Sequence, residues 1–227
     1  MKTQLRQEVT AFCSSLNKAN RSLVQIPQFS ESSHPLIQSL SHYSDRELLA
    51  LFERYPQQGK YFTAIFCRYS STLYVLVASA AHSAQQAHYL HALTWQRIFS
   101  QMREDQTTFD SFQHWLIHTA ATFIQHPHLE DELIRDELAI SPPLWCYVDR
   151  SLEQLPPRQR FVLVMSNKFG WSNEQIIPHL PSGVTPEDIQ SYVDQGYQAL
   201  QAGIPEDIRQ IYLQPSQKSL TGRGDSL

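Results

Sequence analysis

Residues 61–77, YFTAIFCRYSSTLYVLV, decide the fold class of this chain. Apolar side chains recur here at three- and four-residue spacing, at Tyr61, Phe62, Ile65, Phe66, Tyr69, Leu73, Leu76 and Val77. This spacing is the period of one helix face, whereas a half-buried strand alternates every second residue. The stretch therefore predicts a long helix with a buried stripe.

The placement of glycine extends this interpretation along the chain. Only Gly59 precedes Gly170, so most of the sequence lacks the residue that tight turns and phosphate-cradling loops require. Nucleotide-binding α/β folds are therefore disfavoured. Helical spacing continues in residues 45–55, 84–102, 109–125, 145–155, 157–168, 172–179 and 185–200. We predict an all-α protein.

Composition bounds the class of protein. The 227 residues are 41% apolar and 18% charged, as in globular chains. The longest nearly apolar run, residues 73–81, is far shorter than the roughly 20 residues of a membrane-spanning helix. Cys13, Cys67 and Cys146 are far apart, which disfavours a disulfide framework or a cysteine zinc site. We expect a cytoplasmic protein with no membrane contact and no cofactor.

Shifts in composition predict two small helical domains. An acidic run from Glu130 to Glu137 leads to Pro142 and Pro143, which is typical of a connection between domains. We predict an N-terminal arm and linker over residues 1–40, a helical domain over 41–128, a linker over 129–143, a second helical domain over 144–204, and a disordered tail over 205–227.

The second domain contains a helix, a short turn and a capped helix. Ser172 is placed to cap the first of these helices. Thr185 is placed to cap the next one, with Pro186 at the first helical position and Asp188 at the third. This order predicts a helix-turn-helix.

Three motifs follow one another in this second domain. They are Leu155-Pro156-Pro157-Arg158-Gln159-Arg160, then Gly170-Trp171-Ser172 with Glu174 and Ile176, then Val184-Thr185 with Ile189. Their order resembles the fourth conserved region of bacterial RNA polymerase sigma factors of the short extracytoplasmic-function type. Weaker motifs in the first domain resemble the second conserved region of that family: Asp45-Arg46-Glu47-Leu48-Leu49, Tyr61-Phe62, Arg68-Tyr69, Trp95-Gln96-Arg97-Ile98-Phe99 and Trp115-Leu116.

The resemblance covers about residues 44–200 and implies a sigma factor that directs promoter-specific transcription initiation. The partners that it implies are core RNA polymerase, promoter DNA in the holoenzyme and an anti-sigma factor. Its polymerase-binding candidates are Leu90, His91, Trp95, Gln96 and Phe99. Its candidates for the promoter −10 element are Phe112, Trp115, His118 and Thr122, and those for the −35 element are Ser172, Thr185, Gln190, Ser191 and Tyr192.

Three departures from the family pattern favour a second hypothesis. Tyr89-Leu90-His91-Ala92 stands where the family carries an Asp-Leu-Val-Gln-like motif, and Ala120-Ala121-Thr122 stands at an Ala-Arg-Asn core. Residues 171–200 contain four acidic residues and no lysine or arginine. Because DNA affinity comes largely from neutralising phosphates, this surface disfavours DNA. The alternative is a sigma-like interaction protein that no longer reads DNA and acts through protein contacts.

Other chemistry is less favoured by the residue patterns. His88 with His91, and His114 with His118, can each share a helix face, but a zinc site needs three or four ligands, so no metal site is predicted. Protonation of these histidines would add positive charge at low pH. Trp95, Phe112 and Trp115 either fill the core or stack on a flipped base. No catalytic arrangement is found, so neither an enzyme nor a small-molecule substrate is predicted.

Overall fold

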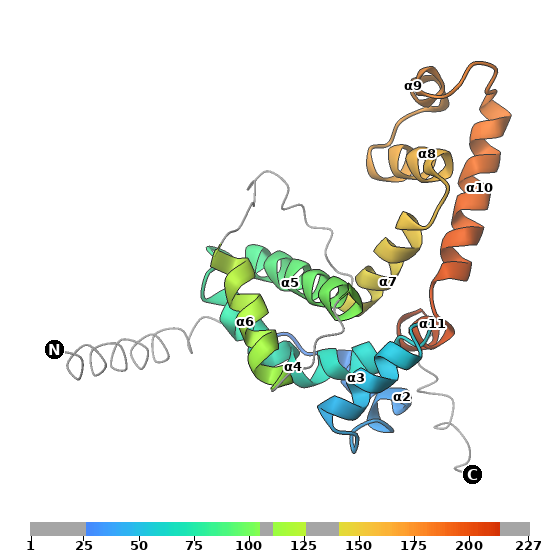
Figure 1. Ribbon diagram of the computed structural model, residues 1–227. Helices are drawn as coiled ribbons and strands as arrows, with labels where there is room; N and C mark the ends of the chain where they lie inside the picture. The colour runs from blue at the N-terminus through green and yellow to red at the C-terminus, as the bar shows by residue number, and fades with distance from the viewer. Residues whose placement is uncertain (1–25, 105–110, 126–140, 214–227) are drawn as a thin grey trace, which may run out of the picture.

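The structure is a computed structural model that describes residues 26–104, 111–125 and 141–213, and these residues form helices and turns without a strand (Figure 1). The all-α prediction is confirmed for this part of the chain. The helices are η1 (Ser30–Ser33), α2 (Pro35–Gln38), α3 (Asp45–Arg54), α4 (Lys60–Ala78), α5 (Ala84–Glu104), α6 (Phe112–Gln125), α7 (Pro142–Glu153), α8 (Pro157–Lys168), α9 (Asn173–Ile176), η3 (Ile177–His179), α10 (Pro186–Gly203) and α11 (Glu206–Tyr212).

Local sequence signals set several helix boundaries. Ser44 begins α3 with a capping box, because its N–H donates to Glu47 Oε2 at 2.7 Å and the Glu47 N–H donates back to Ser44 Oγ at 3.3 Å. Gly170 and Gly183 have φ values of 64° and 95°, which favour glycine, and they lie in the turns after α8 and before α10.

The larger core lies among α3, α4, α5, α6 and α7. Phe62 is fully buried at its centre. Its ring packs edge-on against Phe99 and Trp95 of α5, with centroids 4.8 and 5.8 Å away, and against Tyr147 of α7 at 6.4 Å. The helix predicted from residues 61–77 is therefore the central element of this core.

Helix α7 packs with the N-terminal helices, which corrects the predicted domain boundary. Cys146 and Tyr147 are buried in the larger core together with residues of α4 and α5. The sequence placed α7 in the second domain because the prolines before it resemble a linker. Pro142 instead occupies the first turn of α7, where its missing N–H costs nothing. Residues 129–140 of the predicted linker lie outside the described residues.

Residues 206–212 form helix α11, which corrects the prediction of a disordered tail from residue 205. Ile208 is fully buried in the larger core. The Asp207 carboxylate accepts the N–H groups of Gly59 at 3.0 Å and Lys60 at 2.9 Å, so it satisfies free donors at the start of α4. This short polar segment is stable because it packs on α4. Residues 214–227 lie outside the described residues.

Residues 26–40 are part of the folded body rather than a linker. Glu31 of η1 is 6% exposed and accepts hydrogen bonds from Ser141 Oγ at 2.6 Å and Tyr212 Oη at 3.2 Å. These contacts join the start of the described chain to α7 and α11. The rest of the predicted arm, residues 1–25, lies outside the described residues.

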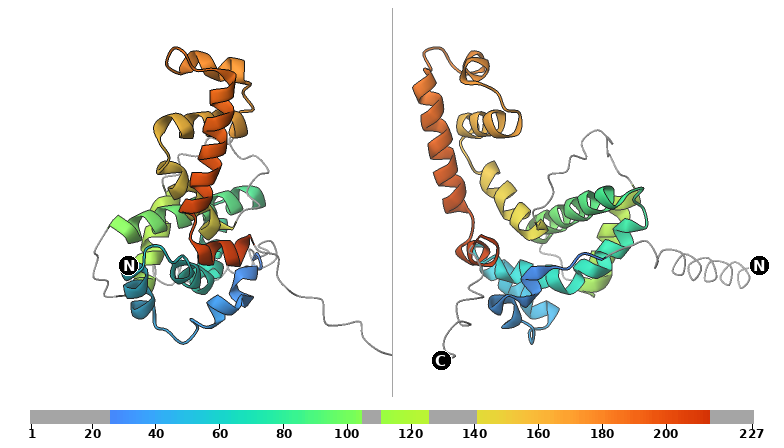
Figure 2. Two further views of the ribbon diagram at one scale, coloured as in Figure 1. Left: turned by 90° about the vertical axis from the view of Figure 1, so that its right-hand side faces the viewer. Right: turned by 180° about the vertical axis from the view of Figure 1, so that it is seen from behind.

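Helices α8, α9 and α10 form a smaller layer that projects from the body (Figure 1, Figure 2). Its core consists of Val162 from α8, Ile176 from α9 and Ile189 from α10. Helix α10 runs from this layer back to the body, where Gly203 lies against Ser151 of α7. Helix α10 therefore connects the projecting layer to the body that contains the larger core.

Candidate nucleic-acid and partner interface

Four of the five predicted polymerase-binding residues are buried. Leu90, His91, Trp95 and Phe99 of α5 are between 0% and 4% exposed. They pack inward because α5 is covered by α4 on one side and α7 on another. These four side chains are therefore not exposed at the surface of α5, and their role as polymerase contacts stays a prediction.

His91 belongs to a buried polar cluster between α4 and α5. Trp95 Nε1 donates to His91 Nε2 at 3.0 Å, and Ser70 Oγ lies 3.1 Å from the same nitrogen. The Ser70 carbonyl oxygen lies 3.2 Å from this nitrogen as well, so Nε2 meets one group that can only donate and one that can only accept. Burial lowers the pKa of His91 to about 4. His91 therefore adds no positive charge near neutral pH.

Gln96 is the one predicted polymerase-binding residue that is partly exposed. Its side-chain amide donates a hydrogen bond to the Asp149 carboxylate of α7. This bond ties α5 to α7 at the edge of a pocket between the two helices. Gln96 is thus held in place by a structural contact while one side of it stays open to solvent.

Helix α6 separates the four predicted −10 residues into two groups. Phe112 is buried, with its ring 5.8 Å from Tyr69 and 5.6 Å from Trp115, which is half-buried against the core. His118 and Thr122 are exposed and lie one turn apart on the same face. Because Phe112 and Trp95 fill the core, neither presents a free ring for a flipped base.

The predicted −35 residues lie at the starts of α9 and α10. Ser172, Thr185, Gln190 and Ser191 are exposed, whereas Tyr192 is half-buried against the smaller core. The exposed surface of α10 thus offers Thr185, Gln190 and Ser191, and Ser172 is exposed separately at the start of α9.

Ser172 and Thr185 act as helix caps, as predicted. The Thr185 N–H donates to Asp188 Oδ2 at 2.8 Å, and the Asp188 N–H donates to Thr185 Oγ1 at 3.3 Å. The Ser172 N–H donates to Gln175 Oε1 at 2.9 Å. These bonds position the starts of α9 and α10.

The exposed face of α10 offers neutral polar groups and acidic groups. Gln190 Nε2 donates to Asp194 Oδ1 at 3.0 Å, and Gln195 Nε2 donates to Ser191 Oγ at 2.9 Å. Four acidic side chains on this layer are exposed: Glu174, Glu187, Asp188 and Asp194. With no cation in residues 171–200, this surface can read hydrogen-bonding groups but cannot neutralise phosphates.

Metal and thiol chemistry find little support in the described chain. Residues 26–104, 111–125 and 141–213 contain no group of three histidine, cysteine or acidic side chains placed to hold a metal ion. Burial raises the pKa of Cys67 to about 12 and also raises the pKa of Cys146, so both thiols stay protonated at neutral pH.

Within the described residues no helix has the length and apolar character needed to cross a bilayer.

The sequence analysis did not single out three residues that cap a helix or line a pocket in the structure. Asp207 caps α4 from a distant part of the chain, and Arg103 and Arg150 line the pocket between α5 and α7. No local pattern marks any of them. Their roles depend on the packing of α7 and α11 against the N-terminal helices, which the predicted domain boundary separated.

Comparisons of the chain with protein-family models, with curated proteins and with solved structures found no match.

Proposed function

We propose that this chain is a sigma-like factor that binds core RNA polymerase and directs promoter-specific transcription initiation. The observation that carries the proposal is the order α8, α9, turn and α10, with a capping hydrogen bond at the start of α9 and of α10 and with Gln190 and Ser191 exposed on α10. In this proposal α9 and α10 are the two helices of a helix-turn-helix, and α10 enters the major groove.

The neutral side chains of α10 suit base recognition better than phosphate binding. An amide such as Gln190 can pair with the N6 and N7 groups of adenine, and a serine hydroxyl can contact any base edge. Because residues 171–200, which include α9 and most of α10, contain no lysine or arginine, their DNA affinity alone is weak. The polymerase then supplies most of the nucleic-acid contact, and α10 contributes the choice of sequence.

The exposed face of α6 is the proposed contact with the −10 element. His114, His118 and Thr122 follow one another at four-residue spacing, and all three are exposed. His118 and Thr122 were predicted −10 residues, and His114 extends their exposed stripe by one turn. On α5, the partly exposed Gln96 and the exposed Arg97 are the side chains of the predicted segment that remain available to the polymerase.

Run-off transcription with purified core polymerase tests the proposal. We expect the full chain to yield specific transcripts from genomic fragments, and we expect Gln190→Ala to reduce them while binding to the core enzyme is retained. Gln198→Ala is the matched control, because Gln198 is an exposed glutamine two turns further along the same helix. Equal transcription by the two variants would argue against base reading by α10.

The acidic surface favours a second candidate function, a sigma-like protein that binds a regulator or the polymerase without reading DNA. Carboxylates at Glu187, Asp188 and Asp194 suit a basic protein partner better than DNA. In that case Asp194→Asn should weaken binding to polymerase or to an anti-sigma factor, and no specific transcript should form at any salt concentration.

A further inference from the structure

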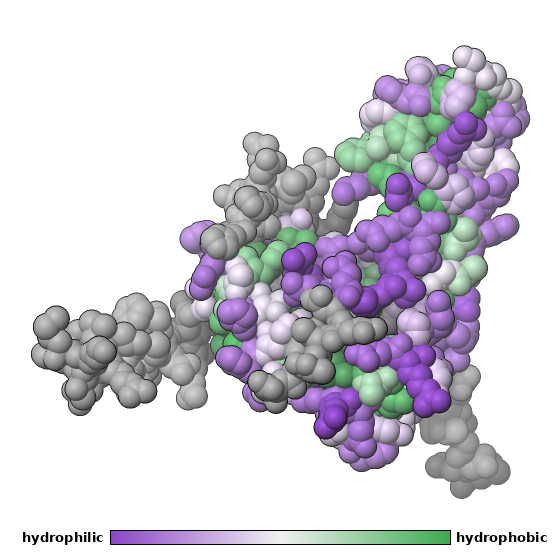
Figure 3. Space-filling model, viewed as in Figure 1, coloured by the Kyte–Doolittle hydropathy of each residue, from purple (hydrophilic) through white to green (hydrophobic). Residues whose placement is uncertain are grey.

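A pocket of about 340 Å³ lies between the last turns of α5 and the outer face of α7. Hydrophilic side chains gather where these two helices meet (Figure 3). The pocket has the volume of a small-ligand site. None of the transcription contacts proposed above uses it, apart from Gln96 at its edge.

Two arginines from different helices, Arg103 of α5 and Arg150 of α7, line this pocket. Arg150 of α7 has its pKa lowered by burial and by the positive charge of Arg103 on α5. Within the described residues neither guanidinium makes an ion pair, since the two that occur join Arg68 to Asp45 and Arg209 to Glu206.

The two arginines are held by neutral contacts. Arg150 donates to the Pro56 carbonyl at 3.2 Å, and Arg103 lies over the Phe99 ring at 5.6 Å. Two guanidinium groups that make no ion pair can bind an anion between them. Phosphate suits them because guanidinium groups bind it through parallel hydrogen bonds.

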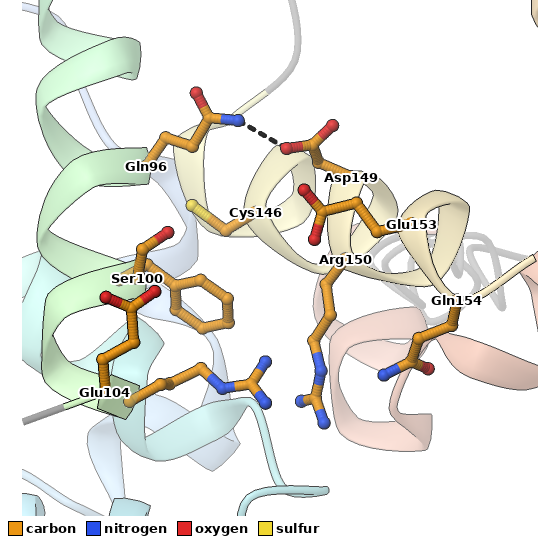
Figure 4. Close-up of a pocket in the computed structure, with 10 residues that line it drawn as sticks. Gln96, Ser100, Glu104, Cys146, Asp149, Arg150, Glu153 and Gln154 are labelled. Atoms are coloured by element: carbon orange, nitrogen blue, oxygen red, sulfur yellow. Dashed lines mark hydrogen bonds between the residues drawn. The ribbon is translucent and has the colours of Figure 1, made fainter.

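The other end of the pocket carries hydrogen-bond acceptors. Figure 4 shows the carboxylates of Asp149 and Glu153 close together, while the side chain of Arg150 extends away from them. Glu104 of α5 also lines the pocket, and Figure 4 shows it apart from Asp149 and Glu153. A ligand that fills the pocket must therefore be anionic at one end and must carry hydroxyl or amino donors at the other.

With arginines at one end and carboxylates at the other, the pocket suits a small anion better than a polymer that carries many negative charges. A nucleic-acid backbone or an acidic peptide would bring further negative charge against the three carboxylates. We propose that the pocket binds a small phosphorylated sugar or nucleoside, with the phosphate on Arg103 and Arg150 and the hydroxyl groups on Asp149 and Glu153. The site stands independently of the proposed role in transcription.

Titration calorimetry on the full chain tests this assignment with four probes: inorganic phosphate, ribose 5-phosphate, adenosine 5′-monophosphate and adenosine. We expect at least one of the two phosphorylated sugar compounds to bind about tenfold more tightly than inorganic phosphate, and adenosine not to bind. Arg103→Gln should weaken that binding by about tenfold or more, because one of the two guanidinium groups is lost. Arg158→Gln, an exposed arginine at the start of α8, is the matched control.

A second variant separates the two ends of the site. Glu153→Gln should leave inorganic phosphate binding equal or stronger, because a repelling charge is removed, while it lowers the preference for the sugar phosphate. Thermal unfolding verifies that each variant is folded, and Arg150→Lys provides a charge-conserving replacement if Arg103→Gln unfolds. It should weaken binding because a lysine cannot make the paired hydrogen bonds.

Three results would overturn the assignment. One is that no phosphorylated probe binds, and another is that the affinity for ribose 5-phosphate in Arg103→Gln stays within about twofold of the unmodified chain. The third is that a single-stranded oligonucleotide binds more tightly than ribose 5-phosphate and loses that affinity in Arg103→Gln, which would assign the arginines to a nucleic-acid backbone instead.

Discussion

The body formed by α3 to α7 and the projecting layer formed by α8 to α10 are stabilised in different ways. Among the described residues, the core of the body contains 20 buried residues, including the rings of Phe62, Phe99 and Trp95, whereas the core of the layer contains three. Since burial of apolar area is the main favourable term in folding, the layer depends far more on its caps and on α10.

This difference matches the proposed division of roles. The layer presents an exposed helix on a small support, as suits a surface that docks on another molecule. The body contains buried polar side chains and a pocket lined by charged side chains, both held between packed helices. Helix α10 joins the two, since Gly196 lies against Leu163 of the layer and Gly203 lies against Ser151 of the body.

The largest expected effect comes from the centre of the body. Phe62→Ala should lower the free energy of unfolding by about 3–5 kcal/mol, because it removes a fully buried ring and leaves a cavity. Urea denaturation measures this loss. The comparison is Ile189→Ala in the layer, which should expose the amides of α8 to α10 to hydrogen exchange while those of α4 and α5 stay protected. Equal loss of protection throughout would show that body and layer are one cooperative unit.

The second effect is a pH dependence that belongs to the body. His91 has a folded-state pKa of about 4, below the ordinary value of 6.5, so the unfolded chain takes up the proton first as the pH falls. His91 therefore contributes stability above about pH 6.5 that is lost between there and about pH 4, by up to roughly 3 kcal/mol. Urea unfolding at about pH 7.5 and pH 5 measures the change.

His91→Gln should reduce this pH dependence, because glutamine cannot take up a proton and can still accept from Trp95. His82→Gln is the control, since His82 is exposed just before the same helix. If His91→Gln and the unmodified chain lose the same stability between the two pH values, His91 is not the group responsible.

The third effect concerns the contact between α11 and α4. A Cβ atom at Gly59 would lie 2.2 Å from Ile208 Cγ1, so Gly59→Ala should cost about 1–3 kcal/mol of unfolding free energy through overpacking. Ile208→Ala removes the atom that clashes. The double variant should therefore lose less stability than the sum of the two single variants. Additive losses would mean that α11 is not seated on Gly59.

The smallest expected effect lies in the layer. Thr185→Ala removes the side chain that accepts the Asp188 N–H and should cost about 1 kcal/mol. Because the layer has little core, this loss should appear as faster hydrogen exchange at the start of α10. Ser44→Ala removes the equivalent cap of α3, and its effect should be masked locally by the larger core.

Local patterns predicted a good part of this fold. The stripe of residues 61–77 became the central helix α4, and Thr185 with Asp188 formed the expected capping box at the start of α10. Both depend on residues within one or two turns of each other, so the sequence contains the whole signal.

The features that the sequence did not reveal depend on contacts between distant segments. Helix α11 is stable because Ile208 and Asp207 meet Gly59, about 150 residues earlier in the chain. The burial of His91 and Leu90, and the presence of Arg103 and Arg150 in one pocket, follow from how α5 packs against α4 and α7. Helical periodicity identifies a buried face but does not identify what covers it.

Binding to core RNA polymerase followed by run-off transcription tests the central claim most directly. The account predicts that the full chain co-purifies with the core enzyme and yields discrete transcripts, which Gln190→Ala reduces and Gln198→Ala does not. Absence of binding to the core enzyme would contradict the proposed function. Binding without transcripts would instead support the second candidate, a sigma-like protein that acts through protein contacts.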